Sequence, residues 1–349
     1  MIDPTRQNNF DALRVLAAIS VIFSHSFLIA EGNDSHEPLI VLTGRQSILG
    51  LAGVFVFFAI SGFLVTQSYQ ETRSPLRYLA KRALRIFPGL LLALLLSAFV
   101  LAPLVTTLPL GAYLHRAEPY RYVLHNMMLS VAVHELPGTM FVDNPVGLEV
   151  NGSLWTLRYE FMMYLMVMAL GVLGCLRLWA SLLLLALGMA CVHFPALDFL
   201  GGWGWLLSFF AVGMVLKELR GTWIFDGRVA LAALAGLALT IKFGGFILFF
   251  PIFGCYLALW LALTPRLPII PAARFGDLSY GLYIYGWPSE QAVIYFLGGH
   301  AAWWQVCGLA LPLAAALAFL SWHLVEAPAL RLKPRSPRRV AQPEIPAAA

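Results

Sequence analysis

The segment Leu13–Ala30, LRVLAAISVIFSHSFLIA, decides the class of this protein because it is largely apolar and yet contains two ionisable residues, Arg14 and His25. Its length is sufficient to cross the ~30 Å hydrocarbon core of a bilayer. An ionisable side chain at that depth costs roughly 2.5–3.5 kcal/mol on insertion scales, so such residues are usually retained for a function. The segment therefore predicts a transmembrane helix that contains functional groups.

The spacing of Arg14 and His25 places both side chains on one helical face, about 16 Å apart along the helix axis. This face has a permanent cation near one membrane surface and a titratable imidazole toward the other. Polar residues within a bundle can also serve only to hold helices together. The alignment of a cation with an imidazole favours a reaction path instead.

Composition indicates an integral membrane protein. Of the 349 residues, 60% are hydrophobic and 12% are charged, whereas soluble domains contain roughly 25% charged residues. Apolar stretches recur along the chain and predict an all-α bundle of about ten transmembrane helices, of which the sixth and seventh are short. The predicted spans are 13–30, 48–66, 86–106, 156–175, 178–196, 203–216, 229–241, 244–264, 278–297 and 302–325.

The distribution of basic residues predicts the orientation. The segments 73–85 and 331–339 are rich in Lys and Arg, which places them, and both termini, on the cytoplasmic side. The net charge of +5 is then explained by anchoring at the membrane surface and does not indicate nucleic-acid binding. The first stretch has no small-x-small cleavage site, so we expect it to be retained and not removed as a signal peptide.

We expect one transmembrane domain over residues 1–330 and a disordered cytoplasmic tail over residues 331–349. A single long loop, about 107–153, is predicted on the outer side, with helical spacing of apolar residues in Tyr120–Val133. Long structured loops often form binding surfaces, although this loop can also be an inert cap. The four cysteines are isolated in apolar segments, so neither a disulfide framework nor a metal site is predicted.

A basic segment precedes the third span. Arg77, Lys81 and Arg85 lie on one helical face, with Arg82 beside them, at the predicted cytoplasmic surface. Guanidinium groups suit phosphate oxygens. Anchoring to lipid headgroups is the alternative for this cluster.

Further ionisable and aromatic residues recur in later spans. Glu160 and Tyr164 share a helical face, and Tyr280 and Tyr283 belong to an aromatic stripe that is more often packing than a site. Glu326 lies at the cytoplasmic boundary at the depth of Arg14, and an ion pair between them would offset the cost of burying either charge.

The order of these motifs resembles the membrane-bound acyltransferase-3 family over nearly the whole bundle. The matching elements are Phe10-Asp11-x-Leu13-Arg14 with His25, Gly53 to Ser61-Gly62, Arg82-x-x-Arg85, Asn151-Gly-Ser-Leu-Trp155 to Glu160, Ser279-Tyr280-Gly-Leu-Tyr283 and Val325-Glu326-x-Pro328. The resemblance implies a multi-pass protein of the bacterial cytoplasmic membrane. It would transfer an acyl group, usually acetyl, from cytosolic acyl-CoA to a hydroxyl of an extracytoplasmic saccharide or lipid-linked glycan.

Roles for individual residues follow from combining the resemblance with the motifs. We expect His25, with Arg14 and Glu326, to perform the reaction, because an imidazole suits a base that works near neutral pH. In a mechanistic alternative, His25 holds the acyl group covalently. The donor residues are expected to be Arg77, Lys81, Arg82, Arg85 and Ser61, and the residues that line the acceptor path Trp155, Glu160, Tyr164, Tyr280 and Tyr283.

Two positions depart from the family pattern. Phe161 stands where the family often has a second carboxylate, and Gly286 stands near the aromatic run where a histidine is often found. Two other classes of function also remain open at the level of sequence. These are a proton-coupled transporter that uses Arg14 and His25 as a relay, and a non-catalytic partner in polysaccharide export.

Overall fold

The protein is described by a computed structural model that covers residues 8–129, 135–138, 140–198, 201–264 and 268–334. Within these residues the chain forms helices and connecting segments and no β-strand, which confirms the predicted all-α class. The longer helices are α1 (Phe10–Glu31), α3 (Leu49–Thr72), α4 (Pro75–Leu96), α7 (Glu118–Met127), α8 (Trp155–Val172), α9 (Leu178–His193), α10 (Trp203–Glu218), α11 (Gly227–Phe243), α13 (Tyr256–Leu263), α14 (Ser279–Phe296) and α15 (Trp303–Ser321). Shorter elements include α2 (Pro38–Leu42), α5 (Ala102–Val105), α6 (Leu110–Leu114), α12 (Phe246–Phe249), α16 (Ala327–Arg331) and the π-helical turns η1 (Ser97–Leu101), η5 (Pro251–Cys255) and η7 (Trp322–Glu326).

A helix occupies each of the ten stretches predicted to span the membrane. Within the described residues, five helical segments are long and apolar enough to cross a bilayer by length and composition, and these are Phe10–Glu31, Leu49–Thr72, Pro75–Val105, Phe246–Leu263 and Trp303–Arg331. The count of ten spans and the cytoplasmic location of both termini stay predictions. The predicted tail begins at the end of α16, and its residues 335–349 lie outside the described part of the chain.

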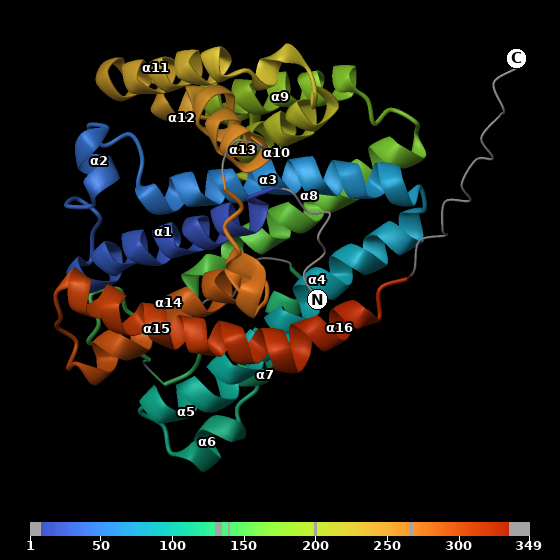
Figure 1. The fold of residues 1–349 in the computed structure, drawn as a ribbon. Coiled ribbons are helices and arrows are strands. Elements are labelled where there is room, and N and C mark those ends of the chain that lie inside the picture. The colour runs from blue at the N-terminus through green and yellow to red at the C-terminus, as the bar shows by residue number, and fades with distance from the viewer. Residues whose placement is uncertain (1–7, 130–134, 139, 199–200, 265–267, 335–349) are drawn as a thin grey trace, which may run out of the picture.

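The helices pack in the spatial order α9, α10, α3, α1, α14 and α15, which brings the first helix into the middle of the molecule (Figure 1). Helix α1 is therefore covered on one side by α3 and on the other by α14 and α15. Its small residues Ala17 and Ala18, together with Val21 and Ile22, are fully or nearly fully buried in these contacts. Side chains of α1 that face α14 are thereby held inside the bundle.

Helix α3 contacts its neighbours through glycine, as expected for small residues that let two backbones approach. A Cβ atom at Gly62 would lie 1.9 Å from the carbonyl oxygen of Phe210, and one at Gly213 would lie 2.0 Å from that of Ala59. No larger residue fits either position, so α3 and α10 touch backbone to backbone. On the opposite side, Gly53 makes the same kind of approach to α1.

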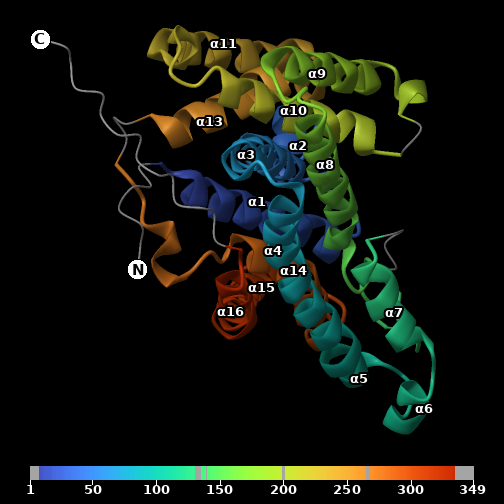
Figure 2. The same ribbon diagram turned by 90° about the vertical axis from the view of Figure 1, so that its right-hand side faces the viewer.

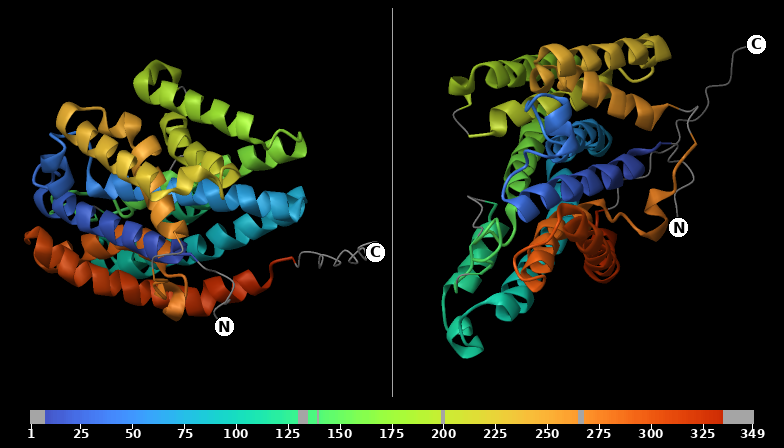
Figure 3. Two further views of the ribbon diagram at one scale, coloured as in Figure 1. Left: turned by 45° about the horizontal axis from the view of Figure 1, so that its top comes forward. Right: turned by 90° about the vertical axis from the view of Figure 1, so that its left-hand side faces the viewer.

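The long loop that is predicted on the outer side folds back along α4. Figures 2 and 3 show α5, α6 and α7 forming an extension on one side of the bundle. Tyr113 of α6 donates a hydrogen bond of 2.7 Å to the carbonyl oxygen of Ala98, and Tyr122 of α7 is fully buried. The predicted helix Tyr120–Val133 is confirmed as α7 up to Met127, and its residues 130–133 lie outside the described part of the chain.

Candidate active site

Helices α1 and α14 run side by side in the same direction, and two groups of ionisable residues mark the two ends of their interface. Near the start of both helices, Arg14 Nη1 lies 3.8 Å from Asp277 Oδ2. Near their ends, His25 Nδ1 lies 3.8 Å from Glu290 Oε2. Gly286 explains how close the helices come, because a Cβ atom there would lie 2.7 Å from Ile22. The departure from the family's histidine thus permits the contact.

The first group, which we call the arginine cluster, consists of Arg14, Arg85, Asp277 and Glu326. Arg85 Nη2 donates a hydrogen bond of 2.8 Å to Asp277 Oδ2, and Arg85 Nη1 lies 3.6 Å from Glu326 Oε2. Burial raises the pKa of Asp277, but the guanidinium groups of Arg85 and Arg14 lower it to about 2. Asp277 is therefore a permanent carboxylate at neutral pH, and two cations face two acidic side chains.

The expected ion pair between Arg14 and Glu326 does not form, because Arg85 takes the place of Arg14. The reason is the position of α4, which packs so closely against η7 that a Cβ atom at Gly89 would lie 3.1 Å from the carboxyl carbon of Glu326. Arg85 of the same helix then reaches Glu326, while Arg14 lies between Asp277 and Asp11 of its own helix.

The predicted basic face of α4 divides into exposed and inward-facing residues. Arg77 is exposed, and Lys81 donates a hydrogen bond of 2.9 Å to Thr72. Arg82 is partly buried, with its guanidinium 5.8 Å from the ring centre of Tyr164. Within the described part of the chain no carboxylate pairs with Arg82, and its Nε atom is buried without a hydrogen-bond partner. Arg82 is thus the inward cation of this face that is not neutralised.

Glu160 connects a residue predicted to bind the donor, Ser61, with another predicted acceptor residue, Tyr164. It accepts a hydrogen bond of 3.2 Å from Ser61 and another from Tyr164, which confirms that Glu160 and Tyr164 share a face of α8. Phe161 instead packs against Phe87, so the position where the family often has a second carboxylate serves apolar packing here. The structure brings Ser61 and the Glu160–Tyr164 pair together.

The remaining predicted acceptor residues are separated. Tyr280 donates a hydrogen bond of 2.9 Å to the carbonyl oxygen of Ile86, and Tyr283 shares one of 2.7 Å with Thr156. Both tyrosines are buried along α14 between the two ends of the interface. Trp155 stacks on Trp205 of α10, on a different face of α8 from Glu160. The structure therefore does not group Trp155 with the other acceptor residues.

The second group, which we call the histidine cluster, consists of His25, Ser26, Trp287 and Glu290. The rings of His25 and Trp287 meet edge to face with 4.8 Å between their centres. The indole of Trp287 donates a hydrogen bond of 3.2 Å to the carbonyl oxygen of Glu149, at the end of the long loop 107–153. Gln291 donates a further hydrogen bond of 2.8 Å to the same oxygen. The loop is thus fixed to α14 beside His25.

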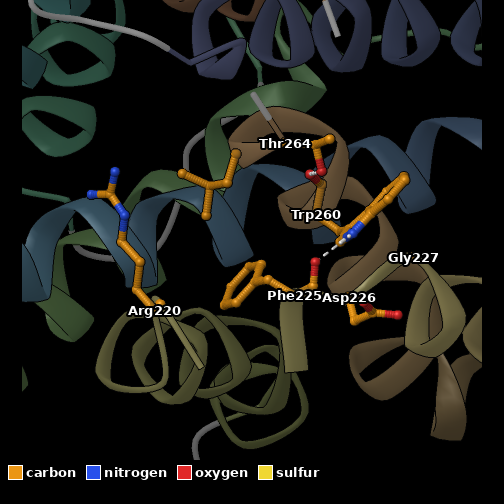
Figure 4. Close-up of a pocket in the computed structure, with 8 residues that line it drawn as sticks. Arg220, Phe225, Asp226, Gly227, Trp260 and Thr264 are labelled. Atoms are coloured by element: carbon orange, nitrogen blue, oxygen red, sulfur yellow. Dashed lines mark hydrogen bonds between the residues drawn. The ribbon is translucent and has the colours of Figure 1, made fainter. Parts of the chain in front are cut away.

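A pocket of about 350 Å³ lies elsewhere, between the segment that connects α10 to α11 and the end of α13 (Figure 4). Its wall includes Arg220, Phe225, Asp226 and Trp260, and the indole of Trp260 donates a hydrogen bond of 3.1 Å to the carbonyl oxygen of Phe225. None of the site residues predicted from sequence lines this pocket. We therefore locate the candidate active site at the α1–α14 interface.

Comparison with known proteins identifies the family of the chain. The family described as the acyltransferase domain (Acyl_transf_3) matches residues 7–322, a range that contains both clusters except for Glu326. The chain belongs to this family. It is 27% identical over 337 residues to a protein of Shigella phage Sf6 named O-acetyl transferase, covering 92% of this chain and 95% of the relative. It is 30% identical over 363 residues to Nodulation protein 10 of Rhizobium leguminosarum bv. viciae, covering 94% of each. No solved structure matches the chain.

The family assignment makes the protein an acyltransferase with membrane character. An acyltransferase needs an acyl donor and an acceptor, and the name of the phage relative indicates a hydroxyl as its acceptor group. This favours an enzyme over the transporter and the non-catalytic export partner that the sequence left open.

Two acidic residues of the site were not assigned a role from sequence. Asp277 lies one residue before the predicted ninth span and Glu290 lies within it. The signal for Glu290 was present, since the argument that singled out Arg14 and His25 applies to any ionisable residue within a span. No comparable signal indicated Ser26, because serine is common in membrane helices.

Proposed function

We propose that this acyltransferase moves an acyl group, in the first instance acetyl, from cytosolic acyl-CoA to a hydroxyl of a saccharide or lipid-linked glycan on the far side of the bacterial cytoplasmic membrane. The observation that supports this most strongly is the double contact between α1 and α14. It gives one continuous interface a cation-rich end at Arg14 and an imidazole at His25. Donor and acceptor can then approach from opposite ends and meet along that interface.

In this proposal His25 acts as the base for the acceptor hydroxyl. The oxygen attacks the thioester carbonyl carbon while the imidazole takes the hydroxyl proton. The carbon–sulfur bond then breaks and CoA leaves as its thiolate, which needs little or no help from an acid. Direct transfer is preferred to an acyl-histidine intermediate, because one imidazole between donor and acceptor can serve both in a single step.

The donor phosphates would bind at the α4 side of the arginine cluster. Arg82 is best suited, because it faces inward and has no carboxylate partner within the described part of the chain. Arg77 and Lys81 would add positive charge at the mouth. Arg85 is held by Asp277 and Glu326, so we assign it to positioning this end of the site, together with Arg14.

The acceptor would enter from the end at which the outer loop is fixed to α14. Glu160, Tyr164, Tyr280 and Tyr283 lie between the two ends and can line the path, with Ser61 beside Glu160. Trp155 would contact a sugar ring only outside this path, since it stacks on Trp205. Carboxylates and phenol hydroxyls suit the hydroxyl-rich surface of a saccharide.

The proposal is tested with membranes from a strain that lacks the protein and is complemented with it. Labelled acetyl-CoA should transfer label to the glycan of these membranes only when the protein is present, and mass spectrometry should find the acetyl ester on that glycan. Label that enters the glycan equally without the protein would contradict the proposed acceptor. Unchanged transfer by a folded His25→Ala variant would contradict the proposed base.

A further inference from the structure

Glu290 is a buried acidic residue of α14 for which the proposed mechanism has no role so far. Its side chain is fully buried, and it lies within a stretch that is otherwise apolar and aromatic, apart from its neighbours Ser289 and Gln291. Burial of an acidic group is costly unless it is paired or hydrogen-bonded. Its presence directly opposite His25 therefore calls for a reason in the chemistry of that residue.

The side chains of His25 and Glu290 face each other through atoms that have no hydrogen-bond partner within the described chain. His25 Nδ1 and Glu290 Oε2 are both buried without a hydrogen bond to any residue of the described chain, and they are 3.8 Å apart. This separation exceeds the length of a hydrogen bond. A small side-chain rotation closes it, and catalytic hydrogen bonds are often long before substrate binds.

The surroundings restrict the other directions in which these groups can turn. Glu290 Oε1 is hydrogen-bonded to Ser26 at 2.7 Å, which leaves Oε2 aimed at the imidazole. The edge-to-face contact with Trp287 limits the plane of the His25 ring. The Nδ1 edge of the imidazole thus faces the acidic group, and the Nε2 atom is the one left for other partners.

We propose that Glu290 is the positioning residue of His25. Its carboxylate accepts the Nδ1–H of the imidazole and so fixes the tautomer in which Nε2 has no proton. This inference rests on the proposed function, in which Nε2 then takes the proton of the acceptor hydroxyl. When that proton arrives, the pair changes from one negative charge to none, a change that a low-dielectric site favours.

The proton and bond changes balance without another reactant. The hydroxyl proton moves to Nε2 as the oxygen forms its bond to the acyl carbon, and the carbon–sulfur bond breaks to release the thiolate of CoA. The imidazolium then returns its proton to that thiolate or to water. In this scheme Glu290 remains a carboxylate throughout. It orients the imidazole ring of His25 and stabilises the imidazolium form.

Transfer kinetics of single and double variants test the proposal. Labelled acetyl transfer is measured in membranes that hold His25→Ala, Glu290→Gln, Glu290→Asp or the His25→Ala/Glu290→Gln pair. We expect Glu290→Gln to slow transfer by about 10²- to 10⁴-fold, by analogy with loss of the carboxylate that orients a catalytic histidine. CoA affinity by calorimetry should stay within about twofold of the wild type, and Glu290→Asp should recover at least about tenfold of the lost rate.

The double variant separates positioning from a structural role. If Glu290 acts through His25, the pair is no slower than His25→Ala alone. If Glu290 only stabilises the fold, the two losses multiply and the melting temperature falls, which overturns the inference. Near-wild-type transfer by Glu290→Gln overturns it as well. Failure of the proposed function is distinguishable, because His25→Ala would then retain transfer.

A measurement on the unaltered protein covers the case in which the Glu290 variants do not fold. Nitrogen-15 spectra of histidine-labelled protein, with the His25 signals identified by their loss in His25→Asn, report which ring nitrogen has the proton. We expect the proton on Nδ1. A proton on Nε2 in the resting protein overturns the inference.

Discussion

The two ends of the α1–α14 interface differ in how their charges are matched. Both ends contain buried atoms without a hydrogen bond to any described residue, which are Arg85 Nη1 and Glu326 Oε2 at one end and His25 Nδ1 and Glu290 Oε2 at the other. In the arginine cluster two guanidinium groups meet two acidic side chains, and one contact, between Arg85 and Asp277, is a hydrogen bond of 2.8 Å. In the histidine cluster, His25 Nδ1 and Glu290 Oε2 face each other without a hydrogen bond. Two cations that face two acidic side chains hold a fixed geometry. The His25–Glu290 pair, in contrast, forms its hydrogen bond only when a proton or a ligand moves. This comparison is consistent with the proposal that donor binding occurs at one end and proton transfer at the other.

The largest effect is expected at the histidine cluster. His25→Ala should lower acetyl transfer by about 10²- to 10⁴-fold, the usual contribution of a general base, while CoA binding by calorimetry stays unchanged. His36→Ala is the matched control, because His36 is an exposed histidine in the segment that follows α1, where it pairs with Glu31. A loss of CoA binding in His25→Ala would contradict the proposal that the arginine cluster binds the donor and the histidine cluster transfers the proton.

Removal of the Arg85 side chain should act mainly on the stability of the fold and less directly on acyl transfer. Arg85→Ala leaves ionised Asp277 with Arg14 alone and leaves buried Glu326 without a cation, so we expect a loss of about 3 kcal/mol in the free energy of unfolding. Thermal unfolding in detergent measures it. Arg85→Ala combined with Glu326→Gln should recover part of the loss. A melting temperature that does not change would show that the arginine cluster is not a stabilising unit.

Arg82 provides a sharper test of the binding end. A charge-assisted hydrogen bond contributes about 1.5–3 kcal/mol, so Arg82→Ala should weaken CoA binding by roughly 10- to 100-fold. Arg73→Ala serves as the control, because Arg73 is an exposed cation just before the same helix. Equal effects of the two substitutions in calorimetry would indicate general surface charge and not a phosphate site.

The smallest effect is expected midway between the ends. Tyr283→Phe removes the hydrogen bond to Thr156 and should cost about 1 kcal/mol in the free energy of unfolding. Thr156→Val should cost a similar amount, and the double variant should cost little more than either alone, as measured by thermal unfolding. Independent, additive losses would mean that these hydroxyls do not act as a pair.

Sequence reasoning identified the elements of this site better than their pairings. The shared face of Arg14 and His25 follows from helix geometry alone, and the structure turns both residues toward α14. The same local geometry predicted the pair of Glu160 and Tyr164 correctly. Contacts within one helix depend on a fixed rise and rotation, so they can be derived from spacing.

Pairings between helices could not be derived in this way. Depth in the membrane suggested Arg14 as the partner of Glu326, but several residues share that depth, and only the packing of α4 against η7 selects Arg85. For the same reason Trp155 was expected on the acceptor path although its helix turns it toward α10. Sequence predicts how deep a side chain lies in the membrane. It does not predict the rotation of each helix or its neighbours, and these decide which side chains meet.

The glycine contacts between α3 and α10 have a consequence for motion. Where the two backbones touch, at Gly62 and Gly213, no side chains lie between them that can rearrange, so we expect these helices to move together. Helices α14 and α15 differ, because each has a proline within it, Pro288 and Pro312, and α15 continues into the π-helical turn η7. Such interruptions are where helices bend. We therefore expect α14 and α15, and not α3 and α10, to move when a bulky donor binds, and amide exchange should be fastest around these prolines and slowest along α3.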